Sequence, residues 1–171
     1  MIRKITLIAA LMLLGLGILV ASAQSVAGTA TANLDVSATV DSSCTISTSA
    51  VTFPDYQPIG ANKESPDDSS GGAVIVTCTV GVNPVVGLSL GAHAAGSQAR
   101  MLHSFSDYLP YGLFQNASRT VAWGPSPPDT VALGPATDTD PRTVAVYGRI
   151  PAGLSPAAGT YYDTVVATLN F

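Results

Sequence analysis

A period of two runs through the segment from Val26 to Val40. The even positions are apolar or small throughout, and from residue 29 onward the odd positions are polar. Successive side chains of an extended chain point to opposite faces, so this pattern indicates a strand with one buried face. A typical strand has about five or six residues. The segment is therefore long enough to serve two sheets, or two molecules.

Further segments favour strands over helices. They are rich in β-branched and aromatic residues, and Gly or Pro clusters separate most of them. The expected strands are 45–53, 73–80, 85–90, 109–114, 119–123, 143–150 and 161–171. Two stretches rich in charge or in Pro, Asp and Thr are expected to be loops, 60–72 and 124–141. Many short strands with regular turns predict an all-β sandwich in one domain.

The N-terminus has the features of an export signal. Arg3 and Lys4 precede an apolar run over 5–20, and Ala21-Ser22-Ala23 supplies a small-x-small cleavage site. A membrane-spanning helix needs about 20 residues, which disfavours the alternative of a retained anchor. We predict that residues 1–23 are a signal peptide and that the mature protein is exported to the periplasm without spanning a membrane.

The charge of the predicted mature chain argues against a nucleic-acid partner. Loss of Arg3 and Lys4 changes the formal net charge from −4 to −6. The five basic residues that remain are scattered along the chain, whereas phosphate neutralisation needs clustered Lys and Arg. Charged residues make up 11% of the sequence, against about 25% in an average domain. Such a surface suits a protein that packs against copies of itself.

Cys44 and Cys78 are the only cysteines. An even number in an exported chain predicts one disulfide. In the chain-entropy model, closing a loop of about 35 residues stabilises the fold by roughly 3–4 kcal/mol. A metal site is the competing interpretation, but the sequence places neither a His nor a third Cys nearby to complete one.

The sequence offers no recognisable catalytic or metal-binding pattern. His93 and His103 are the only histidines, and no spacing supplies a nucleophile, a base and an orienting acid. The acidic pairs at 67–68 and 138–140 fall short of the six to eight oxygen ligands of a calcium site. The aromatic residues of the later strands are interpreted as core residues rather than as a sugar-binding platform. We therefore predict no enzymatic activity, no metal and no cofactor.

A series of short motifs runs in order from about residue 34 to the C-terminus. They are VDSSCTI (40–46), FPDY (53–56), VTCT (76–79), LSLG (88–91), RML (100–102), LPYGLF (109–114), RTVAWG (119–124), VYGRIP (146–151) and GTYYDTV (159–165). Together they resemble the spore coat protein U-like family, the subunits of archaic chaperone–usher pili. Pro54 and Phe114 stand where the family pattern has Gly and Tyr, which casts doubt on local turn details only.

The resemblance implies an incomplete immunoglobulin-like β-sandwich over residues 34–171, in which a missing last strand leaves an apolar groove. Leu34 to Val40 would suit the subunit's own first strand. Residues 24–33 would be a donor-strand extension that inserts into the next subunit, a form of β-strand addition. Its inserted face would be formed by small residues, Val26, Gly28, Ala30 and Ala32. The C-terminal strand would border the groove and pair with the chaperone through Val165, Ala167, Leu169 and Phe171.

The implied function is a structural pilus subunit that supports adhesion and biofilm formation at the cell surface. Its implied partners are like pilin subunits in a head-to-tail homopolymer or heteropolymer, a periplasmic chaperone and an outer-membrane usher. The residues by themselves fit a disordered leader over 24–32 equally well. The alternative function is then a self-contained secreted β-sandwich that binds a carbohydrate or coat component as a monomer.

Overall fold

The structure is a computed structural model that describes residues 27–104 and 106–171. The predicted signal peptide and the predicted donor residue Val26 lie outside the described residues. The chain divides into two units, Met1–Ala38 and Thr39–Phe171. Within the first unit, residues 27–38 form no helix or strand, and each of them is exposed.

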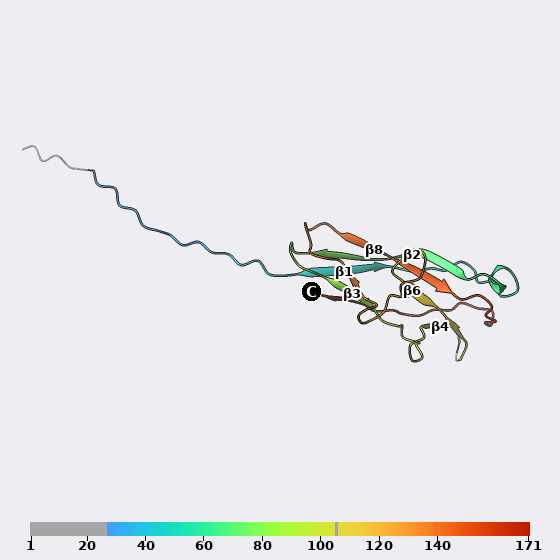
Figure 1. The fold of residues 1–171 in the computed structure, drawn as a ribbon. Helices are drawn as coiled ribbons and strands as arrows, with labels where there is room; N and C mark the ends of the chain where they lie inside the picture. The colour runs from blue at the N-terminus through green and yellow to red at the C-terminus, as the bar shows by residue number, and fades with distance from the viewer. Residues whose placement is uncertain (1–26, 105) are drawn as a thin grey trace, which may run out of the picture. The chain divides into compact units, whose positions relative to one another are not determined.

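The second unit is an antiparallel β-sandwich with one short 3-10 helix (Figure 1). Its elements are β1 (Cys44–Ser49), η1 (Ala61–Lys63), β2 (Asp67–Cys78), β3 (Val85–Leu88), β4 (Arg100–Leu102), β5 (Tyr108–Pro110), β6 (Gly112–Phe114), β7 (Val131–Ala132), β8 (Arg142–Ile150) and β9 (Ala167–Asn170). The sheets have the orders β1-β2-β8-β6, β7-β3-β9 and β4-β5. The predicted all-β class is confirmed.

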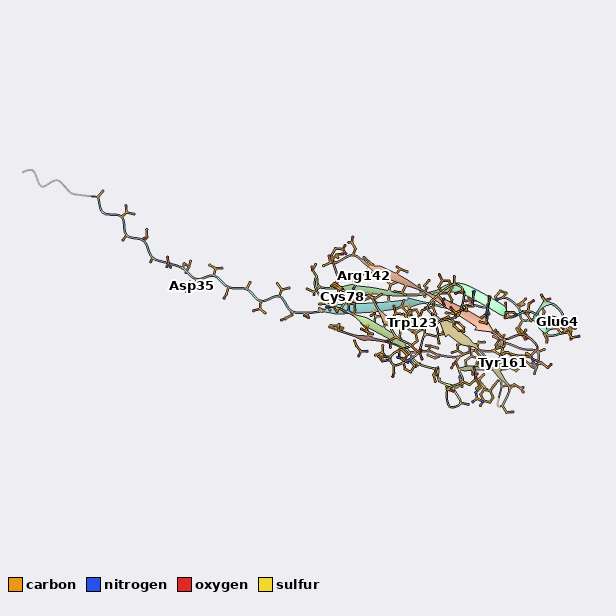
Figure 2. The ribbon with its side chains drawn as sticks, in the orientation of Figure 1. Asp35, Glu64, Cys78, Trp123, Arg142 and Tyr161 are labelled. Carbon is orange, nitrogen blue, oxygen red and sulfur yellow. A yellow bond between two sulfur atoms is a disulfide. The ribbon has the colours of Figure 1, made fainter. Side chains whose placement is uncertain are left out.

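The main core lies between the four-stranded and the three-stranded sheets. Val74 and Val76 of β2 are buried against Val86 and Leu88 of β3. Trp123, labelled in Figure 2, packs in the same cluster. Its indole Nε1 donates a hydrogen bond to the carbonyl oxygen of Val86 at 3.0 Å. A second cluster is formed by Ala99, Leu109, Tyr111 and Ile150.

The predicted disulfide between Cys44 and Cys78 is confirmed. The two cysteines are directly opposite each other in the β1–β2 ladder. The bond therefore joins the start of one strand to the end of the other, and it closes the connection that contains residues 50–66.

Several segments differ from the sequence-based expectation. Residues 67–72, expected to be a loop, form the first part of β2, where a bulge between Ser69 and Gly72 shifts the register against β8. Their polar and glycine-rich composition concealed a strand whose stability comes from pairing with β8 rather than from β propensity. Residues 109–114 form two strands that are separated at Tyr111. β4 was not among the expected strands.

The expected first strand at Leu34 to Val40 is not formed in the structure. β1 begins only at Cys44, and Leu34, Val36 and Val40 are 88%, 87% and 81% exposed. An alternating apolar face stabilises a strand only where a second surface covers it.

Candidate functional site: a groove between two edge strands

A groove lies between two segments that adjoin edge strands of different sheets. Within residues 27–104 and 106–171, β1 pairs only with β2, and β9 pairs only with β3. The groove has a volume of about 930 Å³. Residues 48–56, which continue from β1, form one wall, and residues 156–165 with Ala167, which lead into β9, form the other.

The floor of the groove is apolar and comes from all three sheets. Its residues are buried or half-buried side chains of the strands between the two walls, together with Tyr111, which separates β5 from β6. They are Val74, Leu88, Met101, Leu109, Tyr111, Leu113, Val146 and Ile150. The groove is thus an opening onto the hydrophobic core of the sandwich, and not a hollow on its polar surface.

The inward face of β1 is poorly covered. Ile46 lies opposite the buried Val76, and Thr48 lies opposite the buried Val74, so both side chains point toward the interior. Ile46 is nevertheless 36% exposed, and Thr48 is also exposed. An interior face that stays accessible is what an edge strand shows where a neighbouring strand is missing from the sandwich.

The C-terminal wall shows the same incomplete coverage. Val165, Ala167 and Leu169 point inward and pack against the main core, but each remains only half-buried. Val165 and Ala167 line the groove, whereas Leu169 does not, and Phe171 is 60% exposed. The predicted pairing of these four residues with a chaperone stays a prediction.

A buried carboxylate holds the part of this wall that precedes β9. The side chain of Asp163 is 3% exposed. It accepts hydrogen bonds from the Tyr111 hydroxyl at 2.8 Å, from the His93 ring Nδ1 at 2.9 Å, and from the backbone N–H groups of His93 and Thr164 at 3.2 and 2.9 Å. Burial, and then the Asp163 carboxylate, raise the pKa of Tyr111. The hydroxyl therefore remains a donor to Asp163 at any physiological pH.

A serine side chain bridges the gap between the Asp163 cluster and β9. Ser89 Oγ accepts a hydrogen bond from the Val166 N–H at 2.9 Å, while the Ser89 N–H donates to the Val166 carbonyl at 2.9 Å. The backbone of residues 163–166 is thereby fixed without a regular ladder. Sequence reasoning missed Ser89 and Asp163, because the only signal for them was their place in the LSLG and GTYYDTV motifs. It considered His93 only as a catalytic or metal-binding candidate and did not pair it with Asp163.

The three predicted donor residues that the structure describes have no strand partner there. Gly28, Ala30 and Ala32 are exposed and belong to no strand, and Val26 lies outside the described residues. In the part of the chain that is described, no group of three or more His, Cys, Asp and Glu side chains is placed to hold a metal ion. That part also contains no helix of the length and hydropathy needed to cross a membrane.

Comparison with known proteins agrees with this architecture. The model of the Spore Coat Protein U domain family matches residues 30–168. "Protein U" of Myxococcus xanthus is 40% identical over 166 residues, which covers 90% of this chain and 91% of that protein.

A solved structure shares the fold. It is one chain of the chaperone–tip adhesion subunit pre-assembly complex CsuC–CsuE, from the archaic chaperone–usher Csu pili of Acinetobacter baumannii. The TM-score is 0.56 at 24% identity, over 78% of this chain. This chain spans only 41% of that neighbour's length. The family model covers most of the sequence and the relative is 40% identical over nearly the whole chain, and the chain therefore belongs to the Spore Coat Protein U domain family.

Proposed function

We propose that this chain is a structural, non-enzymatic subunit of a surface fibre, assembled by donor-strand complementation through a chaperone–usher pathway. Family membership and the shared fold support a pilus-type subunit. The observation that carries the proposal is the apolar groove of about 930 Å³ between the walls formed by residues 48–56 and 156–167.

The physical reason is that both walls have backbone N–H and C=O groups with which an added strand can pair. An edge strand presents unpaired N–H and C=O groups, which a further strand satisfies. An apolar side chain that inserts between the walls removes both its own surface and the groove floor from water, which contributes about 25 cal/mol per Å² of apolar area. A strand with one apolar face is therefore the ligand that this groove fits.

The donor is the N-terminal extension, residues 24–33, of another subunit. From Val26 its even positions are small or apolar, which suits a narrow groove, and from Thr29 its odd positions carry polar side chains that remain in water. Insertion into the next copy is a head-to-tail contact, so it propagates as a filament rather than closing a ring. The chain polymerises with itself or with like subunits.

Export and assembly require further partners. Residues 1–23 act as a signal peptide for delivery to the periplasm. A periplasmic chaperone occupies the groove before assembly by pairing with the β9 wall, and an outer-membrane usher exports the fibre. The complex of a chaperone with a tip adhesion subunit among the structural neighbours supports the chaperone. Adhesion and biofilm formation are then properties of the whole fibre.

The test compares two sets of charge substitutions in the extension of the protein purified from periplasm. Gly28, Ala30 and Ala32 are changed to Asp on the proposed inserted face, and Thr29, Thr31 and Asn33 are changed to Asp on the other face. We expect the first set to abolish SDS-resistant ladders and the second set to retain them. A chain lacking 24–33 should form no ladders and should melt at a lower temperature until the 24–33 peptide is added.

The contrary outcome identifies the alternative function. If the protein with and without 24–33 is an equally stable monomer, donor-strand exchange is ruled out. The alternative to test is then a self-contained secreted sandwich that binds a carbohydrate or coat component as a monomer.

A further inference from the structure

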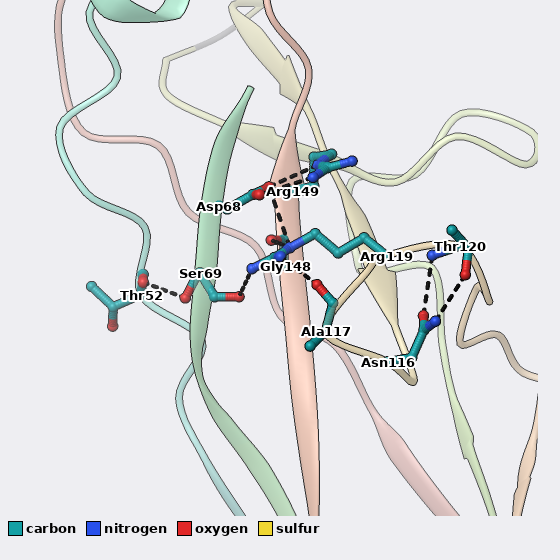
Figure 3. A network of polar contacts seen from close by, with 9 residues as sticks. All are labelled: Thr52, Asp68, Ser69, Asn116, Ala117, Arg119, Thr120, Gly148 and Arg149. Atoms are coloured by element: carbon teal, nitrogen blue, oxygen red, sulfur yellow. Dashed lines mark hydrogen bonds and ion pairs between the residues drawn. The ribbon is translucent and has the colours of Figure 1, made fainter. Parts of the chain in front are cut away.

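Arg119 lies on the outer side of the four-stranded sheet and bonds to the backbone of both β2 and β8 (Figure 3). Its Nε donates to the Gly148 carbonyl of β8 at 2.9 Å, and its Nη2 donates to the Ser69 carbonyl of β2 at 3.1 Å. Its Nη1 donates to the Ala117 carbonyl in its own turn at 2.7 Å. The side chain is only 11% exposed. Three carbonyls are thus held by one guanidinium.

The turn that carries Arg119 is shaped to aim the side chain at the sheet. Arg119 has a φ of 55°, in the left-handed region, which costs a non-glycine residue about 1 kcal/mol. The Asn116 side chain supports this conformation by accepting hydrogen bonds from the N–H groups of Thr120 and Val121, both at 3.1 Å. The backbone of Arg119 is therefore held in an unfavourable conformation, and this conformation directs its guanidinium to β2 and β8.

The contact falls at the β-bulge of β2. The register between β2 and β8 shifts between Ser69 and Gly72, so the regular ladder is interrupted there. Arg119 donates to one carbonyl on each strand at this interruption. The guanidinium therefore fixes the two strands where their own pairing is weakest.

On the inner side of the same bulge lies the wall of the groove. The Ser69 side chain is buried, and its Oγ donates to the Thr52 carbonyl at 2.5 Å. Val51 occupies the space where a Cβ of Gly72 would lie, and Phe53 occupies the space at Gly148, where a Cβ would come within 2.6 Å of the Phe53 ring. Beyond the end of β1, these contacts hold residues 51–53.

We infer that Arg119 is a positioning residue for the groove. By fixing Ser69 and Gly148 from the outer face of the sheet, it fixes the wall segment 51–53 on the inner face and so sets the shape of that end of the groove. The effect of Arg119 on strand exchange rests on the proposed function, whereas its effect on the position of residues 51–53 does not.

The chemistry requires arginine. A planar guanidinium presents several N–H donors in a fixed fork, while a lysine ammonium is a single point charge that cannot reach Gly148, Ala117 and Ser69 together. Arg119 also lies 3.2 Å from the Asp68 carboxylate. Arg149 binds the same carboxylate at 2.7 and 2.8 Å, and its side chain is 35% exposed. Arg149 is thus a matched control that shares the ion pair but makes none of the carbonyl contacts described above.

The test is methyl NMR on the full mature chain, isolated as the monomer fraction and labelled at valine. Val51 reports the wall next to the bulge, and Val165 reports the opposite wall. We expect R119M and R119K to lower the order of the Val51 methyl groups and to leave Val165 unchanged, and we expect R149M to change neither. Unchanged Val51 order in R119M or R119K, or an equal change in R149M, would overturn the proposal.

A second variant covers the case in which R119M does not fold. S69A removes the hydroxyl that bonds to Thr52 and leaves the carbonyl that Arg119 binds. It should loosen Val51 as R119M does, and the R119M/S69A double variant should add little beyond the larger single effect. An ordered Val51 in S69A would contradict the route through Ser69.

Assembly separates this inference from the proposed function. If wild-type protein forms SDS-resistant ladders, those of R119M and S69A should dissociate at a lower temperature than those of R149M, and equal dissociation temperatures would contradict a role in exchange. If the wild type forms no ladders, the proposed function fails, and the Val51 measurement still decides whether Arg119 positions the wall.

Discussion

The two walls of the groove are held by different interactions at their far ends. The first wall is anchored by the Cys44–Cys78 disulfide where β1 begins, and by the Ser69–Thr52 hydrogen bond beyond its end. The C-terminal wall is paired with β3 along β9, and before β9 it is held by the buried Asp163 carboxylate. A short connection joins Cys78 of β2 to Val85 of β3, so the ladder-built parts of both walls lie at the same end of the sandwich.

The comparison shows where the walls are held by regular backbone pairing and where their positions depend on particular side chains. Toward the disulfide both walls continue as strands in backbone ladders, which depend little on residue identity. At the other end both walls leave the ladders. A serine and two glycine contacts fix one side, whereas on the other a carboxylate with three partner residues acts beside an isolated backbone bridge between Leu102 and Tyr162. Substitutions there should alter one wall without altering the other.

The largest expected effect comes from removing the disulfide. The C44A/C78A double variant should lower the free energy of unfolding by roughly 3–4 kcal/mol, because the closed loop of about 35 residues no longer restricts the unfolded chain. Denaturant unfolding of the oxidised wild type, the reduced wild type and the variant measures this. Reduced wild type should match the variant. A loss smaller than that of any C-terminal-wall variant would show that the covalent anchor is not the dominant one.

The next effect is expected at Asp163. D163A should lower the free energy of unfolding by about 2–3 kcal/mol, because the buried Tyr111 hydroxyl and the His93 ring lose their acceptor. Thermal and denaturant unfolding measure the change. D35A is the control, since Asp35 lies in an exposed segment, and it should be neutral. A D163A protein as stable as D35A would mean that the β3–β9 ladder by itself holds this wall.

Y111F should have a smaller effect, about 1 kcal/mol, because it removes one hydrogen bond and keeps the ring in the core. In a double-mutant cycle with D163A, most of this loss should disappear, since the hydroxyl no longer has its acceptor. Y108F, a change on a partly exposed ring, serves as the control. Additive losses in the cycle would exclude a direct coupling between Tyr111 and Asp163.

The smallest effect is a difference in pH dependence between neighbouring carboxyl groups of β2, beneath the first wall. A hydrogen bond from Arg149 lowers the pKa of Asp68 below its usual 3.8, with a further contribution from the charge of Arg119. Burial, and then the charge of Asp68, raise the pKa of Asp67 above 3.8. Asp68 therefore adds stability above about pH 3.8 that is lost as the pH falls through its lowered pKa. Ionisation of Asp67 removes stability as the pH rises through its raised pKa.

Melting temperatures measured from pH 2 to pH 7 test the direction of both pH effects, the stabilisation by ionised Asp68 and the destabilisation by ionised Asp67. D68N should flatten the decline in stability on the acid side, and D67N should melt higher than wild type near neutral pH. R149M should resemble D68N, because it removes the hydrogen bond that lowers the Asp68 pKa. Parallel curves for D67N and D68N would show that the two carboxyl groups do not face different environments.

Much of the fold was accessible from local pattern. The segments expected at 73–80, 85–90 and 143–150 correspond to the later part of β2, to β3 and to β8, because β-branched residues there have an alternating or continuous apolar face. Because the chain has only two cysteines, their number alone predicted which residues form the disulfide. At 161–171 the alternation correctly marks an inward face, but only residues 167–170 form a strand. The preceding residues are held by an isolated backbone bridge between Leu102 and Tyr162, by single backbone hydrogen bonds and by side chains.

The groove itself was implied by the family resemblance and not by the residues one by one. Alternation in Val26 to Val40 predicted an extended segment with one buried face, and the structure shows residues 27–40 exposed and without a strand. An alternating apolar face in a sequence indicates only that some other surface must cover it. Whether the partner is in the same chain is decided by tertiary structure, or by a second molecule.

By itself the sequence determined the all-β class, the disulfide, the strongest strands and the family. Tertiary structure alone decided that polar residues 67–72 form a strand, that Asp163 holds one wall of the groove, and that Arg119 acts on the other. The reason is distance along the chain. Tyr111 and Asp163 are 52 residues apart, and Arg119 and Ser69 are 50 apart. A local pattern records the polarity of each residue, whereas such partners are defined only once the sheets have set their register.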